Sequence, residues 1–280
     1  MIALRNLTIK EIATLKGYVF EVGSESCSIK FCQEIRNLVE NRHLCIGKKI
    51  TIVTPKVPQA YVEMVVMHIL DVIEMIDITA IIINDYGVLF ELRKSGVKVE
   101  FIFGRLLVRS QEYEHNYMKR LDLYENKDVL QSWLNPSILH YKKIELLKKM
   151  NFTGVELSPS DSVKNLLLDI KGFELDVFVH YNLFIGAVGR ACVSAKQNNV
   201  RTGNCSNLCS TTYNLKLSKM YGNFDTPSQE EVDEFSENIV IGNVLYFLKK
   251  VDDFPFDKCK GVIIDGRTNN IKSVLKELEN

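Results

Sequence analysis

Three cysteines lie close together in one polar segment of this 280-residue chain. Cys192, Cys205 and Cys209 follow the spacing C-x12-C-x3-C within GRACVSAKQNNVRTGNCSNLCS, which is rich in Asn, Ser, Thr and Gly. This composition favours an irregular loop over a buried core, so the thiols are expected to be ligands and not small hydrophobic side chains. Three thiolates are one short of the four-cysteine set that holds zinc or an iron–sulfur cluster, and spacing alone leaves both open.

The fourth ligand is expected to be Cys27. It lies in the loop GSESCS directly after the strand-like run YVFEVG (18–23), and the three-cysteine loop also follows a strand-like run, LDVFVHY (175–181). In parallel α/β folds the loops that follow the strands share one face, so the two segments should meet there. The other cysteines are predicted to be small buried side chains, since one lies in the next helix and two precede strands: Cys32, Cys45 and Cys259.

Three further polar residues near the same face are candidate catalytic residues. His180 ends a strand, and we expect it to be a proton donor or substrate ligand, or else a structural hydrogen-bonding residue. Arg190 has the charge to pair with cluster thiolates or an anionic substrate, with a surface ion pair as the alternative. Asp265 ends the run GVIID (261–265) and would line the same mouth. No reaction is assigned, because the sequence contains no GxSxG, HExxH or Walker motif.

Short β-branched runs alternate with stretches of helical period along the chain. The strand candidates are 18–23, 48–55, 78–85, 97–104, 153–158, 175–181, 238–243 and 261–265. The predicted helices include VLYFLKKV (244–251) and the C-terminal NNIKSVLKELEN (269–280). This alternation predicts the α/β class, and right-handed crossovers would close a (β/α)8 TIM-barrel-like fold in which some strands are irregular.

The length fits one such barrel, which typically needs about 250 residues. We therefore expect residues 1–280 to form a single domain. Two segments break the alternation: a polar, tyrosine-rich insertion near 108–136 and a cysteine-bearing loop at 184–212. No Pro/Gly-rich linker divides the chain.

Charge and hydropathy indicate in which cellular compartment the protein is expected and which kinds of partner its overall charge does not favour. Lys and Arg together equal Asp and Glu, 35 of each, so no overall field favours nucleic acid or anionic lipid. The apolar runs are too short to span a bilayer, and the N-terminus lacks the apolar stretch of a signal peptide. A cytoplasmic protein without a membrane span is expected, in which seven cysteines favour thiols or metal ligands over disulfides.

Around the cysteines the sequence resembles the peptidase U32 family. FVHYNL corresponds to a strand that ends in the family's His-Gly-like turn, GRAC to its Gly-Arg-Cys element and GNCSNLC to its Gly-x-Cys-x-x-x-Cys element. Within the family the sequence is most similar to the UbiV-type iron–sulfur proteins of oxygen-independent hydroxylation, whose early cysteine element corresponds to EVGSESCSIKF. Tyr181 replaces the Gly of the turn, and Ala191 separates Gly-Arg from its Cys.

The resemblance implies a TIM-barrel-like fold and a [4Fe–4S] cluster whose ligands are Cys27, Cys192, Cys205 and Cys209. It also implies oxygen-independent hydroxylation, or a related redox modification, of a small molecule or RNA. The chain would act as an enzyme or as an essential subunit, in a heteromer with a paralogous protein of the family. Two alternatives stay open: a collagenase-like peptidase whose cysteines are structural, and a zinc- or cluster-stabilised protein that binds a partner.

Overall fold

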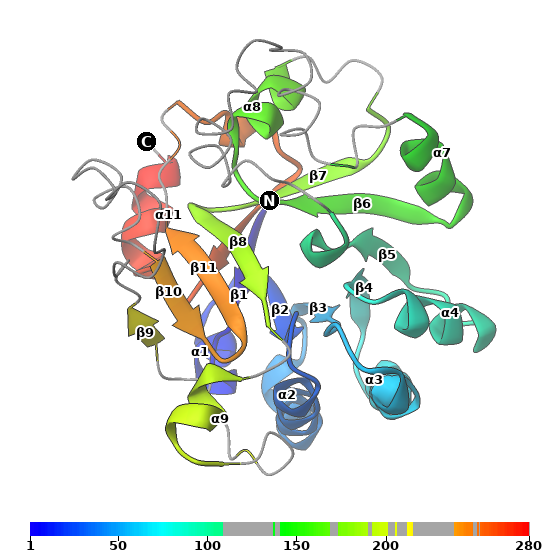
Figure 1. The fold of residues 1–280 in the computed structure, drawn as a ribbon. Coiled ribbons are helices and arrows are strands. Elements are labelled where there is room, and N and C mark those ends of the chain that lie inside the picture. The colour runs from blue at the N-terminus through cyan, green and yellow to red at the C-terminus, as the bar shows by residue number, and fades with distance from the viewer. Residues whose placement is uncertain are drawn as a thin grey trace, which may run out of the picture.

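Eight parallel strands close into a barrel in the order β1-β12-β7-β6-β5-β4-β3-β2 (Figure 1). The computed structural model describes residues 1–108, 137, 141–168, 173–189, 192–200, 205, 212–214, 238–248, 251 and 253–279. The barrel strands are β1 (Ile2–Arg5), β2 (Val19–Gly23), β3 (Lys49–Val53), β4 (Ile78–Ile83), β5 (Glu100–Phe103), β6 (Phe152–Leu157), β7 (Asp176–His180) and β12 (Gly261–Asp265). The predicted (β/α)8 fold is confirmed.

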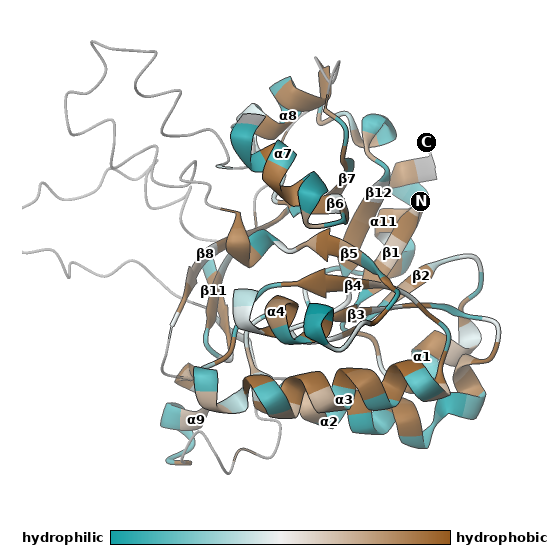
Figure 2. Ribbon diagram, turned by 90° about the vertical axis from the view of Figure 1, so that its right-hand side faces the viewer, coloured by the Kyte–Doolittle hydropathy of each residue, from teal (hydrophilic) through white to brown (hydrophobic). Residues whose placement is uncertain are grey.

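Helices cover the outside of the barrel. They are α1 (Ile9–Thr14), α2 (Ser28–Glu40), α3 (Val62–Met75), α4 (Tyr86–Lys94), α7 (Tyr141–Lys149), α8 (Asp161–Leu168) and α11 (Ile271–Glu279), with short 3-10 turns η1 (Arg42–Cys45), η2 (Gln59–Tyr61), η3 (Arg105–Leu107) and η9 (Phe256–Lys258). In α2 the buried residues Phe31, Ile35 and Leu38 recur at helical spacing, so one face packs on the strands. Figure 2 shows apolar strands inside and polar segments on the outer helices.

The amino-terminal half of the barrel interior is apolar. Its buried side chains are Ala3, Val19, Val53, Ala80, Ile82, Ile102, Phe178 and Ile263. The ring of Phe178 needs space on both neighbouring strands. A Cβ at Gly154 on β6 would lie 2.6 Å from this ring, and a Cβ at Gly261 on β12 would lie 2.8 Å from it. These glycines therefore make room for the largest side chain of the layer.

A second sheet lies over the carboxyl ends of the barrel strands (Figures 1 and 2). Its strands are antiparallel, in the order β8 (Leu183–Val188), β11 (Val244–Leu248), β10 (Asn238–Ile241) and β9 (Thr212–Asn214). Strands β10 and β11 form a hairpin whose two-residue turn is Gly242 and Asn243, with Gly242 at φ +63°. A short helix, α9 (Val193–Gln197), follows β8.

The second sheet corrects several expectations. Residues 238–241 belong to this sheet and not to the barrel, and the helix predicted at 244–251 is wrong, since β11 lies there. The eighth barrel strand is instead β1, a four-residue strand that the pattern did not mark. The segment 184–212, expected as a loop, contains β8 and α9, whereas residues 109–136 of the expected insertion lie outside the described residues. Among the described residues, no helix is long and apolar enough to cross a membrane.

The tight contact at Gly154 predicts that Gly154→Ala destabilises the barrel. The new methyl group would lie 2.6 Å from the Phe178 ring and 2.9 Å from the backbone oxygen of Asp176, which cannot move freely. We expect a loss of about 1–3 kcal/mol in the free energy of unfolding, measured by urea denaturation. Thr153→Ala on the exposed side of the same strand is the control, and its cost should be under about 0.5 kcal/mol. A cost of Gly154→Ala that persisted unchanged in a Phe178→Leu background would contradict this explanation.

Candidate functional site

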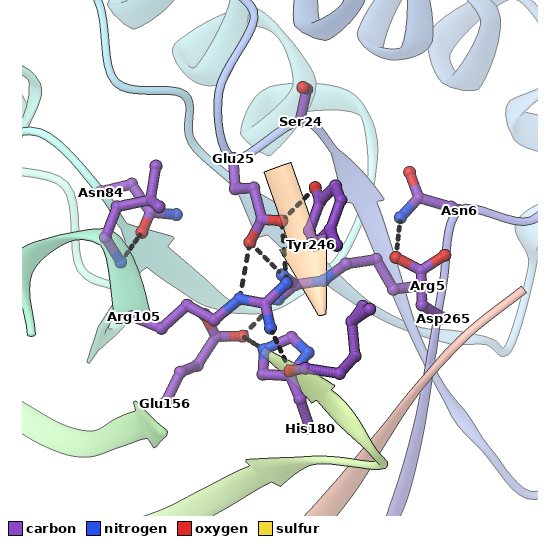
Figure 3. Close-up of polar contacts among 12 residues, drawn as sticks. Arg5, Asn6, Ser24, Glu25, Asn84, Arg105, Glu156, His180, Tyr246 and Asp265 are labelled. Atoms are coloured by element: carbon purple, nitrogen blue, oxygen red, sulfur yellow. Dashed lines mark hydrogen bonds and ion pairs between the residues drawn. The ribbon is translucent and has the colours of Figure 1, made fainter. Parts of the chain in front are cut away.

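A layer of charged side chains lies in the barrel directly above the apolar layer. On β1, β2, β7 and β12 the inward position two residues further along the strand is polar, as in Arg5 after Ala3 and His180 after Phe178. The layer contains Arg5, Glu21, Glu25, Arg105, Glu156, His180 and Asp265, together with Tyr246 from β11. Figure 3 labels all of these residues except Glu21. None of these residues is more than 6% exposed. The second sheet therefore closes a charged mouth, the face on which α/β barrels carry their active sites.

Glu25 is the centre of this layer. Its Oε2 accepts hydrogen bonds from Arg5 Nη1 at 3.0 Å and from Arg105 Nε at 2.9 Å. Its Oε1 accepts from Arg105 Nη2 at 2.9 Å and from the Tyr246 hydroxyl at 2.7 Å. Burial alone would raise the pKa of Glu25, but Arg105 and Arg5 hold it well below its usual value. Glu25 is thus an ionised carboxylate that ties the barrel to the second sheet.

Arg5 joins Glu25 to two further carboxyl groups. Its Nε donates to Glu21 Oε2 at 2.6 Å, and its Nη2 donates to Glu156 Oε1. Burial raises the pKa of Glu21 to about 7, even though Arg5 opposes this shift. Burial likewise raises the pKa of Glu156. Glu21 and Glu156 are thus the carboxyl groups of the layer whose pKa is raised, in contrast to Glu25.

Asp265 is held in place by hydrogen bonds on both of its oxygens. Its Oδ1 accepts from Arg267 N at 2.9 Å and Nε at 3.0 Å, and its Oδ2 accepts from Arg267 Nη2 at 2.6 Å and Asn6 Nδ2 at 2.9 Å. Burial raises the pKa of Asp265, but Arg267 outweighs burial and lowers it. The Arg267 guanidinium also lies 5.4 Å from the centre of the Tyr246 ring. Asp265 thus orients Arg267 beneath the second sheet.

His180 differs from its neighbours because its ring lacks hydrogen-bond partners. The side chain is 1% exposed, yet neither Nδ1 nor Nε2 has a partner within the described part of the chain. Its Nε2 lies 3.6 Å from Glu156 Oε1. Burial, with Arg105 and Arg5 adding to it, lowers the pKa of His180 well below its usual value, so the ring is neutral.

The hairpin turn of the second sheet joins the segments of two predicted cysteine ligands. Asn243 Nδ2 donates to the backbone oxygens of Ser26, at 3.1 Å, and of Gly189, at 3.0 Å. The backbone N–H groups of Gly189 and Val193 donate to the turn as well, to Asn243 O at 2.7 Å and Gly242 O at 2.8 Å. The residues on either side of the Cys192 position are thus fixed against the segment that precedes Cys27.

The third described cysteine of the predicted set also lies near α2. Gln33 Nε2 on this helix donates to the backbone oxygen of Cys205 at 3.3 Å. Cys27 is the N-cap residue of α2, and Cys192 is the N-cap residue of α9, which lies beside α2 in Figure 1. The Sγ of Cys192 accepts a hydrogen bond from Ala195 N at 3.4 Å. Each of these three cysteines is partly exposed.

The structure describes part of the predicted ligand set and leaves the rest untested. Cys209 and Arg190 lie outside the described residues. In the described part of the chain, no three His, Cys, Asp or Glu side chains form a group that could hold a metal ion. What the structure brings together is therefore the segments around Cys27, Cys192 and Cys205, and not an assembled metal centre.

Of the remaining described cysteines, Cys32 and Cys45 are buried as predicted, whereas Cys259 is only partly buried. Cys32 and Cys45 are 5% and 4% exposed and belong to the core between the barrel and its helices. Burial raises the pKa of both thiols, and it raises the pKa of Cys259 to about 12. Thiols that stay protonated are poor metal ligands, because the thiolate is the ligand.

Sequence reasoning missed most of the charged layer. Of its members, only His180 and Asp265 were candidates, whereas Arg5, Glu25 and Tyr246 were not. One signal was present: a charged residue interrupts several apolar runs close to their ends, as in IALR, FEVG and GVEL. In a strand covered on both sides, such a residue has to face the barrel interior and find partners there.

The fold and this mouth define the chain as a (β/α)8-barrel protein with a sheet-covered, charged carboxyl-terminal face. Residues 135–279, just over half of the chain, match the profile of Peptidase family U32. The chain belongs to this family. The match includes β6, β7, the second sheet and β12.

Other comparisons add little. A search of curated proteins finds no match. Among solved structures, a putative mandelate racemase/muconate lactonizing enzyme from Aspergillus oryzae is similar at 11% identity and TM-score 0.35, over 64% of this chain and 44% of its own. A Yersinia pestis DHPS with a pterine-sulfa conjugate is similar at 13% identity and TM-score 0.34, over 72% and 77%. The chain spans less than half of the first of these proteins, and neither likeness bears on activity.

The buried pairing of Arg105 and Glu25 predicts a large effect of Arg105→Met. The change leaves Glu25 inside the barrel without its bidentate partner, so we expect a loss of about 3–5 kcal/mol in the free energy of unfolding. Lys148→Met is the matched control, because it breaks an ion pair with Glu174 whose side chains are 44% and 62% exposed. Its cost should be under about 1 kcal/mol. Equal costs in urea denaturation would show that Arg105 does not stabilise the layer.

The raised pKa of Glu21 predicts a pH-dependent stability. Because this pKa rises from 4.5 to about 7 on folding, the folded chain binds more protons than the unfolded chain between these values. The contribution of Glu21 to the free energy of unfolding must therefore fall as pH rises through this range. Glu21→Gln stays neutral and should flatten the decline, measured by urea denaturation from pH 5 to pH 8. Glu100→Gln on the exposed end of β5 should keep the slope of the unmutated chain. A steep decline that survived Glu21→Gln would refute the assignment.

Proposed function

We propose that the chain is an iron–sulfur protein of the U32 family, similar to the UbiV type, that takes part in oxygen-independent hydroxylation or a related redox modification. Its substrate would be a small molecule or RNA, and a paralogous U32 protein would be its partner in a heteromer. The observation that carries the proposal is the link through Asn243, which joins the segment before Cys27 to the segment before Cys192. Residues more than 160 positions apart thus approach one place on the molecule.

Three cysteine segments that approach this place support a cluster here. Cys27, Cys192 and Cys205 come from separate segments around the start of α2, and each residue is partly exposed. The hydrogen bond from Ala195 N to Cys192 Sγ is of the kind that stabilises a thiolate and tunes a cluster. Cys209 would be the fourth ligand. A bound [4Fe–4S] cluster would supply one-electron transfer.

The chain's own residues then have separate tasks. The four cysteines would hold the cluster, and Glu25 fixes the start of the Cys27 loop two residues away from the ligand. Since Glu25 also binds Arg5 and Arg105 inside the barrel, the predicted cluster loop and the charged mouth share one anchor. A substrate bound at the mouth would therefore lie beside the redox centre.

Iron content tests the proposal. Full-length protein purified without oxygen should be brown, with broad visible absorbance and about four irons per chain. Cys27→Ser, Cys192→Ser and Cys205→Ser should each lose most of the iron. Cys45→Ser is the matched control, because this buried cysteine precedes β3 at the other end of the barrel and should leave the iron content unchanged.

Other results would replace the proposal by a named alternative. Colourless protein with about one zinc per chain would identify a zinc-stabilised protein. Cleavage of gelatin or peptides that survived all three cysteine substitutions would identify a hydrolase with structural cysteines. Equal iron loss in the Cys45→Ser control would mean that the iron reports folding and not these ligands.

A further inference from the structure

We infer that Glu156 and His180 form a water-binding site inside the barrel mouth that holds an exchangeable proton. The inference goes beyond the redox proposal and does not need a cluster. It rests on two buried side chains that face each other with unused hydrogen-bonding atoms (Figure 3). Glu156 is the second-last residue of β6, and His180 is the last residue of the neighbouring strand β7.

The unused atoms define the site. Glu156 is fully buried, and its Oε1 accepts a hydrogen bond from Arg5, whereas its Oε2 has no partner among the described residues. Both ring nitrogens of His180 also lack partners there. A buried polar atom without a hydrogen bond costs about 1–3 kcal/mol, so three such atoms on two facing side chains indicate a bound group.

The charges around the site require a proton. Among the described residues around the mouth, three guanidinium groups face four carboxyl groups and the neutral imidazole: Arg5, Arg105 and Arg267 against Glu21, Glu25, Glu156 and Asp265, with the Tyr246 hydroxyl between them. Glu25 and Asp265 each accept hydrogen bonds from at least one guanidinium group, which is the arrangement of an ionised carboxylate. If all four carboxyl groups were ionised, they would outnumber the guanidinium groups by one. The resulting net negative charge inside the barrel would be costly. One proton shared between Glu21 and Glu156 makes the layer neutral.

Water is the ligand that matches these atoms. It can donate one hydrogen bond to Glu156 Oε2 and a second to the unprotonated nitrogen of His180, and its oxygen can accept from a protonated carboxyl group. The covering second sheet restricts the site to a small ligand, because Arg105 Nη1 donates to Leu183 O at 2.9 Å on β8 and Tyr246 closes the other side from β11. The exchange involves only a proton: protonated Glu156 gives its proton to the water oxygen as the water returns one of its own to the carboxylate, while His180 accepts a hydrogen bond and stays neutral.

Nuclear magnetic resonance on the full chain tests the bound water. Of the five histidines, His180 is identified by the imidazole signals that vanish in His180→Gln. We expect its ring to stay neutral in one tautomer from pH 5 to pH 8 and to show cross-relaxation with a long-lived water. A ring that titrates near its ordinary pKa, or that shows no contact with water, would overturn the site.

Infrared spectroscopy tests the proton independently. At pH 7 the protein should show the stretch of one protonated carboxyl group in a dry environment. Glu156→Gln removes one of the four carboxyl groups, so the layer is balanced without a proton and the band should disappear. Glu100→Gln, at the exposed start of β5, should leave the band unchanged. If Glu156→Gln does not fold, the test rests on two measurements of the unmutated chain: the infrared band and the contact of His180 with water. The absence of either one refutes the inference. Both readouts are independent of iron content, so they separate this site from the cluster proposal.

Discussion

The structure depends on one buried carboxylate. Glu25 binds Arg5 from β1, Arg105 from the turn after β5 and Tyr246 from the second sheet, so a single side chain joins three parts of the chain that are far apart in sequence. It also lies two residues before Cys27. The geometry of the mouth, the position of its cover and the start of the cysteine loop are therefore fixed by the same set of charge-assisted hydrogen bonds.

Burying the charged layer carries a large desolvation penalty. A second apolar layer would fill the same part of the barrel with a smaller penalty. Most α/β barrels pack such layers with branched apolar side chains, as the amino-terminal half of this barrel does with Val19, Ile102 and Ile263. The carboxyl-terminal half of the barrel instead holds buried ion pairs, which lie directly under the second sheet. This division favours a role in function for the carboxyl-terminal half and a role in stability for the amino-terminal half.

The sequence predicted the fold better than the site. Long apolar runs such as ITAIIIND identify buried parallel strands, because covering both faces leaves no polar alternation. The four residues of β1 are too short for such a pattern, so the barrel strand was assigned to 238–243 instead. The Gly242–Asn243 pair is a local signal for a hairpin turn that the sequence analysis did not use, and the helix predicted at 244–251 was therefore wrong. Arg5, Glu25 and Arg105 come from distant segments, and only closure of the barrel brings them together.

The hairpin turn of the second sheet has a further consequence. In the described part of the chain, the sheet that covers the mouth comes from the stretch between β7 and β12, whereas the barrel wall is formed by the strands before and after this stretch. Contacts between wall and cover include Tyr246 to Glu25, Asn243 to Ser26 and Arg105 to Leu183. A different insert at this position that kept these contacts would present another entrance to the same charged floor, because the barrel strands lie outside the inserted stretch.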